Sequence, residues 1–249
     1  LPLALVSGLL SAAMAAVQTQ LTRNPGLLLV FLGVMILAGV VGAVGYGALA
    51  HMAVGPAAGR ETAPGDSWRA GLRFRVWGTL MLQGIGVGVG LIFCLLPGMY
   101  FGLAWAMALP VVFEEPAFAH SAALSRSHEL SRFNPTGGLG NDPRFRIFLI
   151  FVVTLATTYL LMGLAQLPLI VAVAVETARS IADGGREGQL SSFVQWLQVP
   201  TSIVTSFIQA AMTLLGNLGT AVVYFDIRGR QEAKDLDSAI DALDAARNA

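Results

Sequence analysis

The sequence predicts an all-α fold, a polytopic membrane helix bundle. Hydrophobic residues make up 55% of the 249 residues and charged residues only 12%, about half the charged share of a typical soluble domain. Mean hydropathy is +0.68, and long apolar stretches alternate with short polar segments along the chain. We therefore expect about six transmembrane helices, together with a cytoplasmic interfacial helix and an amphipathic C-terminal helix.

Six apolar stretches are candidates for the spans. A hydrocarbon core of about 30 Å requires roughly 20 apolar residues in a helix. The stretches lie at residues 3–17, 26–52, 76–96, 99–113, 147–175 and 199–225. Pro97 and Gly98 predict a tight turn between the third and fourth. The first stretch is short and follows Leu1 rather than a methionine, so we expect the natural chain to begin upstream.

Lysine and arginine predict the orientation of the spans, because cytoplasmic loops carry an excess of both. Twelve of the fifteen Lys and Arg residues lie in the second loop, the fourth loop and the tail. We therefore predict that these segments are cytoplasmic. An even number of spans then places the visible N-terminal end in the cytoplasm as well. The transmembrane domain would occupy residues 1–230, and a cytoplasmic tail residues 231–249.

Glycines in the third stretch predict close helix packing. They recur at every second position: Gly84, Gly86, Gly88 and Gly90. Two G-x-x-x-G pairs result, and small residues at that spacing let helix backbones approach closely in a membrane. A phosphate-binding G-x-G-x-x-G pattern is excluded because Val89 and Leu91 occupy the positions where its third glycine would fall. The pattern leaves internal packing and self-association both open.

Charged residues predicted at the cytoplasmic boundary form a set that we call the charged rim. Its members are Glu114, Glu115, Arg126, Arg146, Asp226, Arg228 and Arg230. Arg126 belongs to the predicted interfacial helix, residues 117–132. Opposite charges at one depth are expected to pair where local polarity is low, so we predict an ion-pair network or contacts with lipid headgroups. Tyr224, Trp77 and Trp105 are predicted to be aromatic anchors at or near the membrane interface.

Residues that would carry chemistry are scarce in the sequence. Cys94 is the single cysteine, and the three histidines show no metal-binding spacing. A phosphodiesterase would need a metal-ligand cluster or a placed acid and base, and neither pattern occurs. We therefore predict no catalytic residues, no cofactor site, no metal site and no enzymatic activity. The net charge of zero gives no reason to expect nucleic acid as a partner.

The tail is predicted to be an amphipathic helix. Leu236, Ala239, Ile240 and Leu243 fall on one stripe at spacings of three and four residues. Aspartates occupy much of the remaining surface: Asp235, Asp237, Asp241 and Asp244. An acidic face is poorly suited to an anionic leaflet, which attracts Lys and Arg. We therefore expect the stripe to dock on protein, either on this chain's own loops or on a partner.

Several motifs resemble a known family. In chain order they are LPG at 96–98, ALPVVFEE at 108–115, ALSRS at 123–127, RFR at 144–146 and YFDIRGR at 224–230. Together they resemble the bacterial six-helix proteins called "glycerophosphoryl diester phosphodiesterase membrane domain". The resemblance implies the six-helix fold and a place in the bacterial cytoplasmic (inner) membrane. It implies no catalytic barrel within these residues, because that barrel is a separate soluble domain in the family's fusions.

Three functional hypotheses follow from the sequence. The first is a non-catalytic scaffold or accessory subunit of a larger membrane complex, with membrane lipids and other membrane subunits, or a second copy, as partners. The second is a protein that binds or transports lipids or other amphiphiles, suggested by the arginine-rich rim. The third and weakest is a membrane domain associated with a phosphodiesterase. The sequence does not name the partner, the ligand or the oligomeric state.

Overall fold

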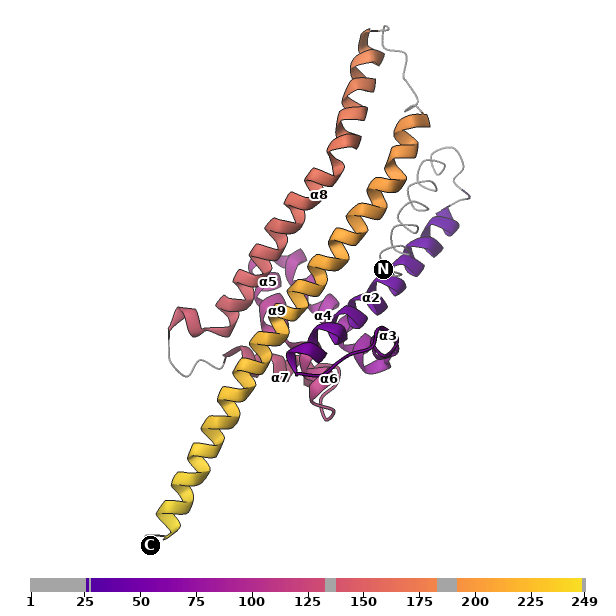
Figure 1. The fold of residues 1–249 in the computed structure, drawn as a ribbon. Helices are drawn as coiled ribbons and strands as arrows, with labels where there is room; N and C mark the ends of the chain where they lie inside the picture. The colour runs from indigo at the N-terminus through magenta and orange to yellow at the C-terminus, as the bar shows by residue number, and fades with distance from the viewer. Residues whose placement is uncertain (1–25, 27, 133–137, 183–191, 248–249) are drawn as a thin grey trace. The chain divides into compact units, whose positions relative to one another are not determined.

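The computed structural model describes residue 26 and residues 28–132, 138–182 and 192–247, so the predicted span at 3–17 lies outside the described residues. All regular secondary structure in this part of the chain is helical (Figure 1). The elements are α2 (Leu28–Ala57), α3 (Pro64–Gly71), α4 (Phe74–Phe93), α5 (Leu95–Ala104), α6 (Ala108–Glu114), α7 (Ser121–Arg132), the 3-10 helix η2 (Leu139–Asn141), α8 (Pro143–Ala182) and α9 (Ser192–Arg247).

Five helical stretches among the described residues are long and apolar enough to cross a membrane. They are Leu28–Ala57, Phe74–Phe93, Leu95–Glu114, Pro143–Ala182 and Trp196–Asp237. Each overlaps one of the last five stretches predicted from the sequence. The all-α class is therefore confirmed, together with an architecture suited to a membrane protein.

The chain divides into two compact units, and α2, α8 and α9 contribute to both. The first unit comprises residues 1–45 and 154–213, and the second comprises residues 46–153 and 214–249. The described part of the first unit consists of apolar helical segments with largely exposed side chains, such as Leu29 at 78% and Tyr159 at 68%. The second unit contains the main core and the whole charged rim, and it is described by itself below.

The core of the second unit joins residues far apart in the sequence. Tyr224 of α9, Met107 before α6, Leu130 of α7 and Val76 of α4 are all at most 1% exposed and belong to one apolar cluster. Burying large side chains contributes about 1.5–3 kcal/mol each relative to leaving them in water. Within a bilayer the corresponding gain comes from close packing, because lipid tails are as apolar as leucine. The core therefore sets the positions of the rim side chains that adjoin it.

The turn between α4 and α5 lies earlier than the sequence predicts. The chain reverses at Cys94, whose backbone is extended (φ −172°, ψ 146°), whereas Pro97 and Gly98 are already part of α5. The prediction of a turn at Pro97 and Gly98 is wrong because Pro97 is the third residue of α5. The first four N–H groups of a helix have no partner in the helix, so a proline is tolerated there.

The fourth predicted span is two helices rather than one. α5 ends at Ala104 and α6 begins at Ala108. Pro110 accounts for the interruption, because it lacks the N–H that would bond to Ala106 and its ring would clash with that carbonyl. The buried Ser127 Oγ of α7 donates a hydrogen bond of 2.9 Å to the carbonyl of Ala104. A side chain of α7 thus satisfies a carbonyl group at the end of α5.

The four glycines of α4 occupy two different environments. A Cβ on Gly90 would lie 2.9 Å from the Cα of Gly98 in α5, and one on Gly86 would collide with the ring of Trp105. A Cβ on Gly84 or Gly88 would meet no described atom within 4 Å. Gly86 and Gly90 therefore let α4 and α5 approach closely, while the face with Gly84 and Gly88 takes no part in this contact.

We predict that Gly90→Ala destabilises the protein whereas Gly88→Ala does not. The added methyl at position 90 meets backbone rather than a flexible side chain, and overpacking of this kind costs about 1–3 kcal/mol. At position 88 the alanine gains up to about 1 kcal/mol of helix propensity. Thermal unfolding of the two purified variants in the same detergent measures the difference. Equal melting temperatures would contradict the predicted α4–α5 contact.

Candidate functional site

The end of α6 directs two neighbouring carboxylates to different partners. α6 ends at Glu114, and Glu115 has left helical geometry (φ −114°, ψ 87°) because Pro116 follows it and disfavours the helical region. Glu114 forms an ion pair with Arg60, which lies after α2. Glu115 instead meets residues of α7 and α9.

Glu115 joins three helices through its two oxygens. Tyr224 OH of α9 donates a hydrogen bond of 2.9 Å to Oε1, and Arg126 Nε of α7 lies 3.3 Å from Oε2. The Glu115 and Arg126 side chains are only 14% and 23% exposed. A carboxylate with so little access to water depends on these donors for stabilisation.

Arg126 and Tyr224 extend this network in both directions. Arg126 also reaches Glu129 at 3.4 Å and the side-chain oxygen of Gln231 at 3.3 Å. Tyr224 OH accepts a hydrogen bond of 3.4 Å from Arg228 Nη1. The network therefore connects α6, α7 and α9 through alternating donors and acceptors.

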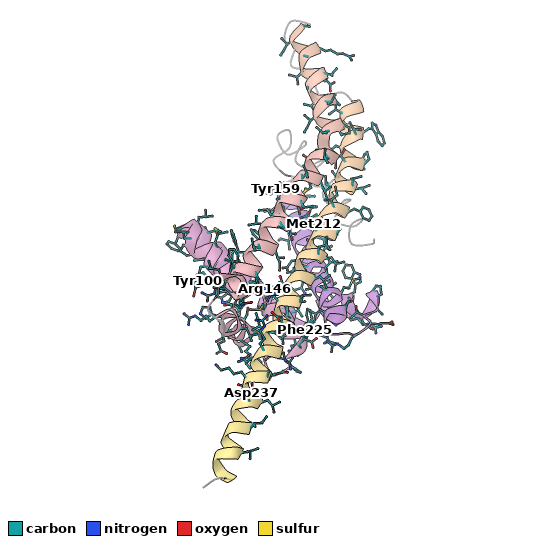
Figure 2. The ribbon with its side chains drawn as sticks, turned by 60° about the vertical axis from the view of Figure 1, so that its left-hand side comes forward. Tyr100, Arg146, Tyr159, Met212, Phe225 and Asp237 are labelled. Atoms are coloured by element: carbon teal, nitrogen blue, oxygen red, sulfur yellow. The ribbon has the colours of Figure 1, made fainter. Side chains whose placement is uncertain are left out.

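A second network connects α8 to α9. Asp226 of α9 pairs with Arg146 of α8 and, one turn along α9, with Arg230 at 3.1 Å. Figure 2 labels Arg146 on α8 and Phe225, the neighbour of Asp226, on α9. Two arginines share one carboxylate, so Asp226 fixes the beginning of α8 against the middle of α9.

Arg75 of α4 also belongs to the site. From the sequence it is only one of the basic residues of the second predicted loop. Its Nη2 donates to the carbonyls of Val112 at 2.9 Å and Phe118 at 3.1 Å. Both carbonyls belong to the end of α6 and the connection to α7. An arginine at the start of an apolar helix was the only sequence signal, and it does not identify backbone carbonyls as the partners.

The connection into α7 is held in an unusual backbone conformation. His120, the residue before α7, has φ +54°, a left-handed conformation that is uncommon for residues other than glycine. Its backbone N–H donates a hydrogen bond of 2.9 Å to Thr79 Oγ1, and its ring lies against Gly78, where a Cβ would collide with it. Contacts from α4 therefore stabilise the bend that starts α7.

The side chain of Arg144, at the beginning of α8, contacts α5 and α7. Its guanidinium is 5.0 Å from the centre of the Tyr100 ring, and its Nε donates to Ser131 Oγ at 3.3 Å. His128 also faces Tyr100, with ring centres 6.0 Å apart. Partial burial, followed by the nearby Arg132 and Arg144, lowers the pKa of His128. The lowered pKa favours the neutral form of the His128 imidazole.

The structure brings together most of the predicted rim, with two changes in partner. Glu115 pairs with Arg126, and Asp226 with Arg146 and Arg230. Arg228 pairs with Glu232 at 2.8 Å rather than with a predicted carboxylate, and Glu114 pairs with Arg60 from outside the predicted set.

Tyr224 and Trp105, which the sequence predicts to be interfacial anchors, both make protein contacts within the second unit. Tyr224 is fully buried, and its hydroxyl serves Glu115. Trp105 is half-buried above Gly86 and stacks on Phe101, with ring centres 4.8 Å apart. The spacing of apolar residues predicts that a tyrosine lies on a helix. Whether its side chain faces lipid or protein depends on which other helices pack beside it.

Within the described residues, no group of three or more His, Cys, Asp or Glu residues lies close enough to hold a metal ion. Comparisons with protein-family models, curated proteins and solved structures give no match.

We predict that Glu115→Gln destabilises the protein by about 2–4 kcal/mol, because Arg126 would lose its buried charged partner. Tyr224→Phe removes one donor to Glu115 and a weak acceptor of Arg228, and it is expected to cost about 1–2 kcal/mol. Asp66→Ala is a matched control, since its ion pair with Arg69 is long (4.0 Å) and exposed, and exposed pairs contribute little. Thermal unfolding in one detergent compares all three. A Glu115→Gln variant as stable as the control would contradict the network's structural role.

Proposed function

We propose that this chain is a non-catalytic integral membrane protein that acts as a scaffold or accessory subunit of a larger membrane complex. The observation that carries the proposal is the pairing within the charged rim. Arg126 and Arg146 contact carboxylates outside their own helices, Glu115 and Asp226, and Arg228 contacts Glu232 within α9. The first two pairs hold helices together, and the paired charges leave the apolar outer surfaces as the parts of the chain that meet other molecules.

Membrane residence is supported by the exposure of large apolar side chains on membrane-length helices. Ile92 and Phe93 are each 83% exposed and Leu96 is 74% exposed at the α4–α5 turn. Soluble proteins rarely leave contiguous apolar surface of this kind in water. Lipid tails, or the helices of other subunits, provide an environment in which such side chains are stable.

The proposed topology has six spans, with both visible ends in the bacterial cytoplasm. The distribution of lysine and arginine supports this orientation, and the motif resemblance supports both the number of spans and the bacterial inner membrane. In this topology the charged rim marks the cytoplasmic boundary and α7 lies along it. The α4–α5 turn at Cys94 then faces the opposite side.

The pairing of the rim arginines also makes lipid or amphiphile transport a weaker candidate. A cationic path for headgroups needs arginines free to contact phosphate, whereas the three rim arginines named above already have carboxylate partners. One observation favours simple lipid binding. Arg144 Nη2 is buried without a hydrogen-bond partner, and a phosphate oxygen is a suitable acceptor for a guanidinium.

The topology predicts opposite labelling of two sites in intact cells whose outer membrane has been made permeable. Cys94 is the only cysteine and is exposed at the α4–α5 turn, so a membrane-impermeant maleimide added from outside is expected to label it. In the Cys94→Ser background, Gly140→Cys places a single thiol in η2, where a Cβ meets no described atom within 4 Å. That thiol is expected to react only after the cytoplasmic membrane is opened. Labelling of Gly140→Cys from outside would contradict the orientation.

The scaffold proposal predicts a stable complex. The full chain, carrying a tag at its N-terminal end, is purified from its native membranes into lipid nanodiscs with mild detergent. Another membrane subunit is expected to co-purify at a fixed stoichiometry through size exclusion. A monodisperse single chain without a partner, obtained repeatedly in different mild detergents, would contradict the proposal.

A further inference from the structure

The C-terminal part of α9 presents an exposed apolar stripe. Leu236, Ile240 and Leu243 are 63%, 48% and 70% exposed, and they recur at the first, fifth and eighth positions of a helical series. Residues at this spacing lie on one face, and a helix that docks through an apolar face uses anchors at these positions. Ala233, one turn earlier, extends the same face.

The second unit of the chain does not cover this stripe. Tyr224 and Ile227 are the last buried residues of α9, and the described side chains after the half-buried Gln231 are exposed. Figure 1 shows the yellow end of α9 continuing past α6 and α7, and Figure 2 labels Asp237 on this projecting end. The sequence left open whether the stripe docks on this chain's own loops or on a partner. The described loops of this unit do not contact it.

The length of α9 carries the stripe away from the charged rim. A helix rises 1.5 Å per residue, so Leu236 and Leu243 lie about 15 Å and about 25 Å along the axis from Asp226. Each interfacial layer of a bilayer is only about 5–8 Å thick. If the rim marks the cytoplasmic boundary, as in the proposed function, a helix leaving along the membrane normal carries the stripe into water.

The charge of the tail disfavours both lipid and a second copy as the occupant. Residues 232–247 contain five acidic and two basic residues, whereas helices that bind an anionic leaflet are rich in Lys and Arg. In a parallel pair of tails, position 232 of one helix faces position 237 of the other. Glu232 would then oppose Asp237, and an antiparallel pair would also align acidic borders with one another.

We propose that residues 233–247 dock a basic amphipathic helix of a different protein. Leu236, Ile240 and Leu243 are the apolar anchors, and Asp237 beside them selects a partner with Lys or Arg beside its own apolar stripe. This inference rests on the proposed function, because it gives the chemistry of the partner that an accessory subunit would hold.

The test uses the full chain in nanodiscs of zwitterionic lipid and two fluorescent synthetic peptides of 21 residues. Both peptides have leucine at the stripe positions, and the border positions are lysine in one and glutamate in the other. The lysine peptide is expected to bind with one-to-one stoichiometry at least tenfold more tightly than the glutamate peptide. The affinity should fall as salt rises. Empty nanodiscs measure any binding to lipid.

Three variants separate the stripe from the rest of the chain. Ile240→Ser is expected to weaken binding of the lysine peptide at least tenfold, and Asp237→Lys at least threefold. Leu139→Ser removes a leucine of η2 that is 75% exposed and should leave binding unchanged. Since all three side chains are exposed, unchanged melting temperatures are expected to show that the variants fold.

Three results obtained with the purified chain alone or with the peptides would overturn the proposal. They are equal binding of both peptides, binding that survives Ile240→Ser, and a dimer of the chain that Ile240→Ser dissolves. Purification of Ile240→Ser from native membranes separates this proposal from the proposed function. A partner retained by that variant contradicts tail docking and leaves the scaffold role standing. A wild-type chain that binds the lysine peptide through the stripe but carries no native partner supports docking and contradicts the scaffold role.

Discussion

The second unit depends on a single carboxylate placed where three helices meet. Glu115 leaves α6 just before a proline, which turns its side chain away from the path taken by Glu114. It receives the Tyr224 hydroxyl from α9 and the Arg126 guanidinium from α7. Arg126 is 11 residues from Glu115 and Tyr224 is 109 residues away, so this contact exists only where the three helices pack together. The apolar core around Tyr224 and the polar network therefore stabilise each other.

Prolines and small residues set the geometry that makes this meeting possible. Pro110 divides the fourth apolar stretch into α5 and α6, and Ser127 of α7 satisfies the carbonyl of Ala104 at the break. Gly90 and Gly98 allow α4 and α5 to pack at backbone distance. These features bring the end of α6 next to α4, where Arg75 donates hydrogen bonds to the carbonyls of Val112 and Phe118. The helix break at Pro110 and the close packing at Gly90 and Gly98 thus position the charged rim.

The ion pairs of the charged rim support the proposed scaffold function. Arg126 and Arg146 join helices through their carboxylate partners, as a scaffold needs, and the paired arginines offer little free positive charge to a headgroup. The apolar faces and the acidic end of α9 then remain as surfaces for other molecules. In this proposal the rim holds the helices of the second unit together, and the exposed stripe at Leu236, Ile240 and Leu243 contacts another molecule.

The sequence by itself determined the helical class and five of the apolar stretches, and it named charged residues that the second unit contains without naming their partners. Hydrophobic length and the spacing of charges are local properties, so 26–52 and 147–175 could be read without a structure. Only the tertiary structure decided that Arg228 pairs with Glu232, that Arg75 serves backbone carbonyls, and that Tyr224 faces protein. It also moved the turn from Pro97 to Cys94. These outcomes depend on which helices become neighbours, and the spacing of residues along one chain does not contain that information.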